Sequence, residues 1–241
     1  MNTDTVLVFK PSHYNPSKAY PLVYLLHGYS QDYKQWSHIL PLQTISDEND
    51  FIIVCPDGFV SWFVNSPNDS TSRMEDFFFK ELVPRIHSTV NVDKLNVFIS
   101  GLSMGGYGAL RYFLLHPGYF NTAGSTSGGT EVDYTLLKAA SMQFFGTDRV
   151  TKDLSRLLAK NWHQYNITTL LTGNTKPFIF DCGTDDILYP SFLKLQQACK
   201  ALHIPATSIS QPGDHNETYW HNSIQAHFNY FNAHKKRSSQ K

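Results

Sequence analysis

NVFISGLSMGGYGAL, residues 96–110, contains the most informative motif of this sequence. An apolar run enters the G-x-S-x-G motif of residues 101–105, and a helix-forming run leaves it. A serine on such a tight strand-to-helix turn adopts a strained conformation, and only small residues fit two positions to either side. The Ser103 hydroxyl would then lie exposed at the tip of a strand, facing the positive end of a helix. The stretch predicts a nucleophilic serine, with an ordinary glycine-rich turn as the alternative.

Further apolar runs on both sides of this stretch predict strands. Residues 21–26 and 51–55 are apolar almost throughout, which indicates strands covered on both faces and hence a mostly parallel sheet. Helical patterns lie between the strands, as at 76–90, where Pro84 is a candidate kink. This alternation predicts an α/β fold with helices on both faces of the sheet, in one domain over residues 1–241. The predicted strands are 5–9, 22–26, 51–55, 95–100, 122–127, 178–182 and 207–211.

The segment 129–176 departs from this alternation. It is long, it falls between two predicted strands, and it contains helical stretches such as 151–163. Long loops without function are uncommon in a compact domain. We interpret the segment as a helical excursion over the C-terminal ends of the strands, a partial lid. An ordinary crossover helix with long loops is the alternative.

Composition narrows the class of function. The 20 basic and 20 acidic residues balance, which argues against a nucleic-acid partner. No run reaches the roughly 18 apolar residues of a membrane span, so no membrane partner is expected. The first residues lack the basic and apolar regions of a secretory signal, so we expect a cytoplasmic protein unless the sequence begins after a removed signal. Neither metal-ligand spacing nor a nucleotide-binding loop is present, so no metal and no cofactor are expected.

A nucleophilic serine of this kind needs an acid and then a histidine downstream, in that order. Residues 178–186 read FIFDCGTDD, a predicted strand followed by a turn. Asp186 is the candidate acid, because the loop after Gly183 must turn before it can present a carboxylate. Asp185 is its rival, and Asp181 is expected to lie still within the strand.

The candidate base is His215. Residues 209–216 close the last predicted strand with a Pro-Gly turn, which delivers this histidine to a loop 29 residues after Asp186. Its Nε2 would take the Ser103 proton, while the acid fixes the tautomer. Three later histidines are expected to be structural or exposed, because they fall in a predicted terminal helix: His221, His227 and His234.

An oxyanion hole needs two backbone N–H donors. One is expected at Met104, directly after the nucleophile, and the other in the loop after an early strand. Residues 25–30, LLHGYS, provide that loop, and the N–H of Tyr29 is the candidate. His27 is expected to order the loop by hydrogen bonds.

Taken together, these segments resemble the putative-esterase group of α/β-hydrolases. That group includes S-formylglutathione hydrolase (esterase D), tributyrin esterases, mycolyltransferases, and feruloyl and acetylxylan esterases. The resemblance implies the α/β-hydrolase fold, a triad of Ser103, Asp186 and His215, and oxyanion donors at Tyr29 and Met104. The matching segments follow the family's order between about residues 5 and 232: 20–28, 56–58 with 61–62, 101–110, 181–186 and 213–216.

The sequence also departs from the pattern of that group. The group usually has one or two more strands before the position of residue 5, a difference that suggests either a truncated sequence or a minimal fold. The group's Gly-Gly-His-Asn reads Gly-Asp-His-Asn at 213–216, which puts an extra carboxylate beside the candidate base. Phe63 replaces the usual tyrosine after Trp62, which removes one hydroxyl near the expected pocket.

These features predict a serine carboxylic-ester hydrolase that works through an acyl-enzyme. The expected partner is a small-molecule or carbohydrate-linked ester with a short-chain acyl or hydroxycinnamoyl group. Acyl transfer or thioester hydrolysis, as in S-formylglutathione hydrolase, is the alternative, and a complete triad disfavours a non-catalytic binding module. A homo-oligomer is left open. The candidate substrate-binding residues are aromatic, with packing of the lid as the alternative role: Trp62, Phe63, Trp162 and Tyr189.

Overall fold

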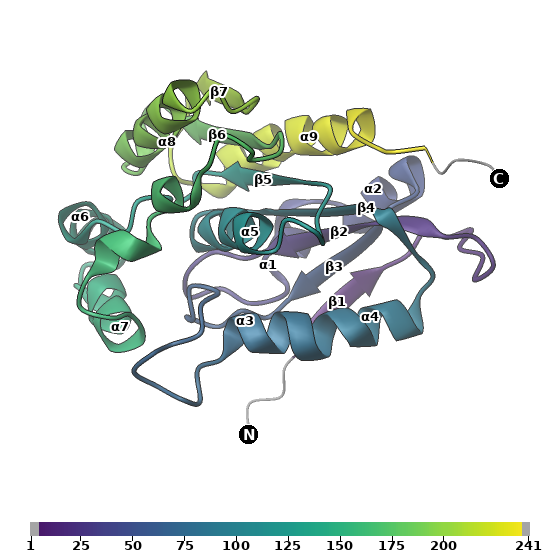
Figure 1. Ribbon diagram of the computed structural model, residues 1–241, viewed down its shortest axis with the longest axis horizontal. Coiled ribbons are helices and arrows are strands. Elements are labelled where there is room, and N and C mark those ends of the chain that lie inside the picture. The colour runs from purple at the N-terminus through teal and green to yellow at the C-terminus, as the bar shows by residue number, and fades with distance from the viewer. Residues whose placement is uncertain (1–4, 238–241) are drawn as a thin grey trace.

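A seven-stranded sheet with helices on both faces forms the centre of the computed structural model, which describes residues 5–237 (Figure 1). The strand order is β1-β3-β2-β4-β5-β6-β7, and only the β1–β3 pair is antiparallel. The mostly parallel sheet confirms the predicted fold class, and every predicted strand is present to within a few residues. The strands are β1 Val6–Phe9, β2 Tyr20–Leu26, β3 Ile52–Pro56, β4 Val92–Gly101, β5 Thr122–Thr126, β6 Ile179–Gly183 and β7 Thr207–Gln211.

Side chains of the central strands alternate between two hydrophobic cores. In β2, Leu22, Tyr24 and Leu26 join one core, whereas Val23 and Leu25 join the other. Successive side chains of a strand point to opposite faces of a sheet. A continuous apolar run is therefore what a strand needs when helices cover both faces.

The helices divide between these two cores. One face of the sheet is covered by α3 Met74–Phe77, α4 Val83–Thr89, α5 Met104–Leu115 and α8 Tyr189–Ala201. The opposite face is covered by α1 Gln35–Ile39, α2 Leu42–Asn49 and α9 Glu217–Ala233. The sequence prediction named neither α1 nor α2, which are short.

Pro84 changes the helix in which it lies without ending it. It stands at the first turn of α4, and a π-helical stretch, η1 Phe78–Leu82, comes directly before. Proline has no N–H to give to the carbonyl four residues earlier. A wider turn before Pro84 accommodates that missing bond, so α3, η1 and α4 follow one another without a loop.

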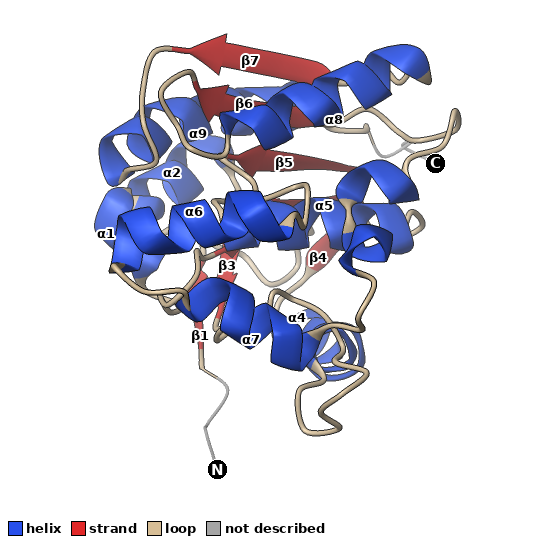
Figure 2. Cartoon of the chain, turned by 90° about the vertical axis from the view of Figure 1, so that its left-hand side faces the viewer, coloured by secondary structure: helices blue, strands red, loops and turns tan. Residues whose placement is uncertain are grey.

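The excursion 129–176 contains two helices, α6 Tyr134–Phe145 and α7 Arg149–Leu157. They lie side by side across the edge of the sheet toward which the parallel strands point (Figures 1 and 2). Asp133 caps the N-terminus of α6 by accepting the N–H of Leu136, and Gly146, whose φ is 65°, caps its C-terminus. The excursion was predicted, but α6 was not named. The helix predicted at 151–163 is in part α7, followed by the 3₁₀ turns η2 Trp162–Tyr165 and η3 Ile167–Leu170.

Two further observations concern the cysteines and the length of the apolar helices. Cys55, Cys182 and Cys199 are free and buried. Between residues 5 and 237, no helix is both long and apolar enough to cross a membrane.

Candidate active site

Ser103 lies on a tight turn between β4 and α5, with φ of 53° and ψ of −119°. Two glycines make this turn possible. A Cβ on Gly101 would lie 2.3 Å from the carbonyl oxygen of Gly105, and a Cβ on Gly105 would lie 2.2 Å from that of Leu26. The Ser103 N–H donates to the carbonyl of Thr126 at 3.0 Å, which helps to hold the left-handed conformation.

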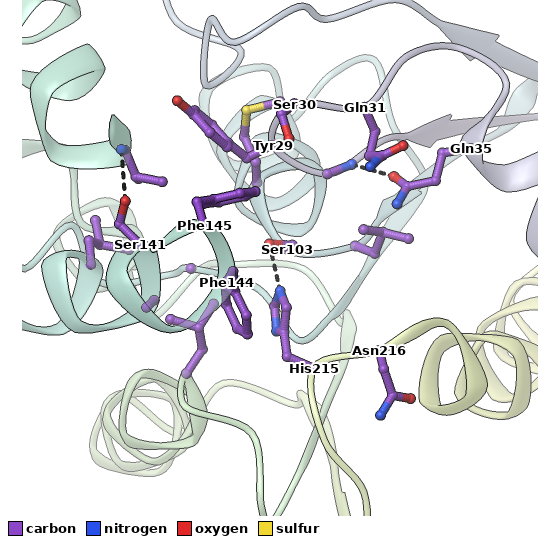
Figure 3. A pocket seen from close by; sticks show the side chains of 18 of the residues that line it. Tyr29, Ser30, Gln31, Gln35, Ser103, Ser141, Phe144, Phe145, His215 and Asn216 are labelled. Carbon is purple, nitrogen blue, oxygen red and sulfur yellow. Dashed lines mark hydrogen bonds between the residues drawn. The ribbon is translucent and has the colours of Figure 1, made fainter. Parts of the chain in front are cut away.

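The Ser103 hydroxyl forms a hydrogen bond with His215 (Figure 3). On its other side, His215 forms a hydrogen bond with Asp186. The distances are 3.0 Å from Ser103 Oγ to His215 Nε2 and 2.8 Å from His215 Nδ1 to Asp186 Oδ2. Because Nδ1 faces a carboxylate, it carries the proton, and Nε2 is left to accept from the serine hydroxyl. The structure thus brings together three side chains that the sequence prediction selected from distant segments.

The environment of Asp186 keeps it ionised. Its side chain is fully buried, and Oδ1 accepts the N–H of Leu188 at 2.8 Å. Burial alone would raise the pKa of this carboxyl, but the hydrogen bonds from His215 and Leu188 outweigh it, and the pKa is lowered. Of the alternatives, Asp185 is exposed, and Asp181 lies buried in β6.

His215 is held by its own loop and by two rings. Asp214 accepts the N–H of His215 at 2.7 Å, so the extra carboxylate binds the backbone beside the base. Asn216 caps α9 by accepting the N–H of Tyr219 at 3.0 Å. Phe144 of α6 stacks on the imidazole at 4.7 Å between ring centroids, and Trp220 packs edge-on at 5.1 Å.

The loop after β2 passes directly beside the nucleophile. A Cβ on Gly28 would lie 3.6 Å from the Cβ of Ser103. His27 orders this loop as expected, because Nε2 accepts the N–H of Gly58 at 2.7 Å and Nδ1 donates to the carbonyl of Gly28 at 2.8 Å. Gln35 of α1 accepts the N–H of Gly28 at 2.8 Å. Sequence reasoning missed Gln35, since nothing in one sequence separates it from a surface glutamine.

The two candidate oxyanion donors flank the nucleophile. Met104 is the first residue of α5, so its N–H has no carbonyl partner inside the helix. The N–H of Tyr29 donates no backbone hydrogen bond within the described part of the chain. Both residues line the cavity that contains Ser103. Two N–H donors beside a nucleophile suit a developing oxyanion.

The side chain of Tyr29 links this loop to the excursion. Its hydroxyl donates to Asp153 of α7, and the guanidinium of Arg149 lies 5.3 Å from its ring centroid. Burial and the bond to Asp153 raise the pKa of Tyr29 to about 12, so the phenol stays protonated and remains a donor. One residue therefore offers its backbone to the reaction site and its side chain to the lid.

A cavity of about 320 Å³ opens at Ser103 and His215 (Figure 3). Trp62, from the loop after β3, lines it as the sequence prediction expected. Much of its apolar surface comes from the excursion, which supplies a wall that we call the acyl wall. The acyl wall consists of Leu137, Ala140, Phe144, Phe145 and Val150. The prediction of a lid over the strand ends anticipated the place of this wall but not its residues.

The structure corrects three of the four predicted substrate aromatics, which lie away from this cavity. Phe63 is fully buried, with its ring packed against Gly58 and Gly108. Trp162 lies against Tyr134 in a separate cavity at the beginning of α6. Tyr189 stacks on Phe192, and its hydroxyl is 2.8 Å from Ser210 Oγ. For Phe63, Trp162 and Tyr189 the prediction of a place at the acyl cavity is wrong.

No cluster of three or more His, Cys, Asp or Glu side chains suited to a metal ion occurs among residues 5–237. The acidic and imidazole groups at the site are instead engaged with one another. The arrangement is that of a serine hydrolase: an oriented base, a buried carboxylate and two backbone donors around one hydroxyl.

The model of the family described as "Putative esterase" matches residues 1–231. The chain belongs to this family. An acetyl esterase of Caldicellulosiruptor saccharolyticus is 25% identical over 221 residues, which cover 86% of this chain and 82% of the relative. An esterase of Mycobacterium tuberculosis is 32% identical over 131 residues, 51% of this chain, and the match spans only 28% of that longer relative.

A solved structure of a ferulic acid esterase has the same fold as this esterase. Its TM-score is 0.80, at 22% sequence identity, over 95% of this chain and 92% of the other. The predicted family and the α/β-hydrolase fold are therefore confirmed. The description of the family and the name of the Caldicellulosiruptor saccharolyticus relative agree with the predicted class, that of an esterase.

Proposed function

We propose that this esterase cleaves carboxylic esters through an acyl-enzyme on Ser103. His215 Nε2 takes the hydroxyl proton as Ser103 Oγ bonds to the ester carbonyl carbon, and Asp186 stabilises the imidazolium. The N–H groups of Tyr29 and Met104 donate to the oxyanion. Collapse of the tetrahedral intermediate expels the alcohol, which receives its proton from His215.

Water completes the cycle. His215, again neutral, takes a proton from a water molecule as the water oxygen attacks the acyl carbon. The carboxylic acid product then leaves, and Ser103 Oγ recovers its proton from His215. The observation that carries this proposal is the continuous hydrogen-bonded chain from Ser103 through His215 to Asp186, next to two backbone donors.

The shape and lining of the cavity support a class of substrate. A volume of about 320 Å³ lies at the lower end of the range of about 300–1,000 Å³ for ligand pockets, which suits a short or aromatic acyl group better than a long acyl chain. Trp62, Phe144 and Phe145 offer aromatic surface to that group. Gln31, Asn216 and Glu217 line the cavity as well, and their polar groups suit the hydroxyls of a carbohydrate alcohol.

A substrate panel tests this proposal. Wild type and Ser103→Ala would be compared on methyl ferulate, p-nitrophenyl acetate, p-nitrophenyl palmitate, acetylated xylan and S-formylglutathione. We expect wild type to cleave the ferulate and acetate esters well and the palmitate poorly, and Ser103→Ala to lose all these activities. Equal rates for wild type and Ser103→Ala would overturn the mechanism. A preference for the thioester over every oxygen ester would favour thioester hydrolysis.

A pair of variants tests the acyl wall. Phe144→Ala removes the ring that stacks on His215 and lines the cavity, so we expect kcat/KM for methyl ferulate to fall more than that for p-nitrophenyl acetate. Trp162→Ala is the matched control, because Trp162 lines a different cavity. An equal loss on both esters in Phe144→Ala would show that Phe144 does not select the acyl group.

A further inference from the structure

A second Ser–His–Asp set lies buried behind the candidate active site. Ser100 Oγ is 2.8 Å from His227 Nδ1, and His227 Nε2 is 2.6 Å from Asp181 Oδ2. Each of these residues is at most 2% exposed. No substrate reaches such a site, so the set needs another explanation than a second reaction centre.

The members of this set stand on elements that carry the candidate triad. Ser100 lies on β4, three residues before Ser103. Asp181 lies on β6, whose C-terminal end leads into the loop of the candidate acid. His227 lies on α9, which begins directly after the loop of the candidate base. The two hydrogen bonds of the set therefore join the elements that support the three candidate reacting side chains.

Two hydroxyl groups extend the set to a fourth element and satisfy its remaining acceptor. Thr126 Oγ1 of β5 donates to Asp181 Oδ1 at 2.7 Å. Ser223 Oγ of α9 lies 2.8 Å from Thr126 Oγ1 and must be the donor there, since the threonine proton is already used. A buried polar network with every member bonded fixes one arrangement, because any displacement leaves a desolvated group without a partner.

The sheet leaves space for this network at one position. A Cβ on Gly124 of β5 would lie 2.4 Å from His227 Nδ1 and 2.9 Å from Ser100 Oγ. Only a glycine at this place allows the imidazole to reach across β5 to β4. The contact between His227 and Ser100 therefore depends on the absence of a side chain at Gly124.

Nearer the active site the same segments meet a second time. The N–H of Asp185 donates to the carbonyl of Gly213 at 2.9 Å, and the N–H of Thr184 donates to that of Gln211 at 2.9 Å. The acid loop and the histidine loop are therefore joined by backbone at the sheet edge. The buried set joins the elements that support them at a deeper level, and it includes β4 through Ser100.

We propose that Ser100, His227 and Asp181 are positioning residues that set the distance between Ser103 and the His215–Asp186 pair. The proposal rests on the function proposed above. Without the Ser100 hydroxyl, β4 loses its hydrogen bond to α9 and keeps apolar packing such as that of Phe98 on Phe231, so the nucleophile can move relative to its base. A misplacement of about 1 Å between reacting groups can cost on the order of 100-fold in rate.

Ser100→Ala against Ser125→Ala tests the proposal. Ser125 is also a buried strand serine, but its hydroxyl has no hydrogen-bond partner in the described residues, so the same atom is removed without touching the set. We expect Ser100→Ala to lower kcat for p-nitrophenyl acetate by about 5- to 50-fold with KM within about twofold. Ser125→Ala should keep the wild-type kcat.

A second pair of variants distinguishes a loss of positioning from a loss of folding. Thr126→Val removes the hydroxyl that binds Asp181 and keeps the shape, whereas Thr126→Ser keeps the hydroxyl. We expect the valine variant to lower kcat and the serine variant to restore most of it. Thermal unfolding of all four variants separates a fall in kcat from a fall in the folded fraction.

Proton NMR supplies a spectroscopic readout. The His215 Nδ1 proton bound to Asp186 should give a low-field resonance that shifts or broadens in Ser100→Ala and not in Ser125→Ala. Wild-type kcat and an unchanged resonance in Ser100→Ala would overturn the proposal, as would equal losses in the two serine variants. Ser103→Ala separates the two proposals: if it stays active the proposed function fails, whereas this inference fails if Ser103→Ala is inactive and Ser100→Ala behaves as wild type.

Discussion

Replacing Gly105 by alanine is expected to damage the reaction site by pushing two backbones apart. The new Cβ would lie 2.2 Å from the carbonyl oxygen of Leu26 and 2.5 Å from that of His27. Ordinary contact begins at 3.4 Å, and neither oxygen can rotate away, so α5 and the end of β2 must separate by roughly 1 Å. Overpacking of this kind costs about 1–3 kcal/mol. Alanine regains about 1 kcal/mol through its higher helix propensity.

The net loss of stability is therefore modest, about 0–2 kcal/mol, which lowers Tm by a few degrees in a chain of this size. The loss of activity should be much larger. The two elements that move apart carry the candidate oxyanion donors. Met104 begins α5, and Tyr29 lies in the loop after β2. Loss of one such donor costs about 100- to 1,000-fold in kcat. We expect kcat to fall about 100-fold or more.

Thermal unfolding and hydrolysis of p-nitrophenyl acetate would measure the two effects on the same preparation. Gly118→Ala is the control, because a Cβ there meets nothing within 4 Å. Both activity and Tm should stay near wild type in the control. A Gly105→Ala enzyme with wild-type kcat would refute the reasoning, because the added methyl group would then have been absorbed without moving either donor.

Further predictions concern the acid, the lid and the loop beside the nucleophile. Asp186→Asn should lower kcat by about 1,000-fold or more, because an amide can favour the wrong tautomer of His215. The lowered pKa of Asp186 makes its carboxylate stabilising above the unfolded pKa of about 3.9, and this stabilisation is lost as pH falls through the lower folded pKa. Urea midpoints of Asp186→Asn should accordingly fall less steeply than those of wild type between pH 5 and pH 2; parallel curves would contradict this. Tyr29→Phe should lower the free energy of unfolding by about 1–2 kcal/mol, because it removes a hydrogen bond to a carboxylate, and Asp153→Asn, which keeps an acceptor, should lower it less. Gln35→Leu should lower kcat about tenfold at unchanged KM, whereas Gln35→Glu should retain most of the activity because it still accepts the N–H of Gly28; equal kcat in the two variants would count against a positioning role for Gln35.

The sheet and the order of the candidate triad were predictable because each leaves a local trace in the sequence. Runs such as residues 21–26 are apolar on both faces, so they identify buried parallel strands without any partner being known. Ser103, Asp186 and His215 each follow a predicted strand. The ends of parallel strands meet at one edge, so their meeting follows from topology alone.

The lining of the cavity was not predictable in the same way. Trp62 and Phe63 are neighbours in the sequence, and both were expected at the substrate. Each has a positive φ, 53° and 54°, so the chain turns sharply here, with one ring at the cavity and the next in the core. Phe144 stacks on His215 across 71 residues of sequence, and nothing local marks that contact.

The buried network shows the same limit. Asp181 was expected within its strand and His227 in the terminal helix, and both lie there. Their hydrogen bond joins residues 46 positions apart, and the neighbouring contact of His227 with Ser100 needs the gap left by Gly124. Such a contact depends on which strand face meets which turn of helix, and a single sequence does not contain that register.

The acyl wall has a consequence for how new specificities can arise in this scaffold. The nucleophile, acid and base stand on the sheet edge, whereas the wall comes from a separate insert, residues 129–176. The insert is fastened by buried side chains that join the core and by hydrogen bonds, among them Tyr29 to Asp153, Ser66 to the carbonyl of Leu157 and Asn68 to that of Leu158. A graft that keeps these fastening points and the ring of Phe144 on His215 can replace the rest of the wall while the reacting atoms stay in place. The acyl preference could therefore be changed by exchanging most of residues 129–176, with the nucleophile, acid and base left unaltered.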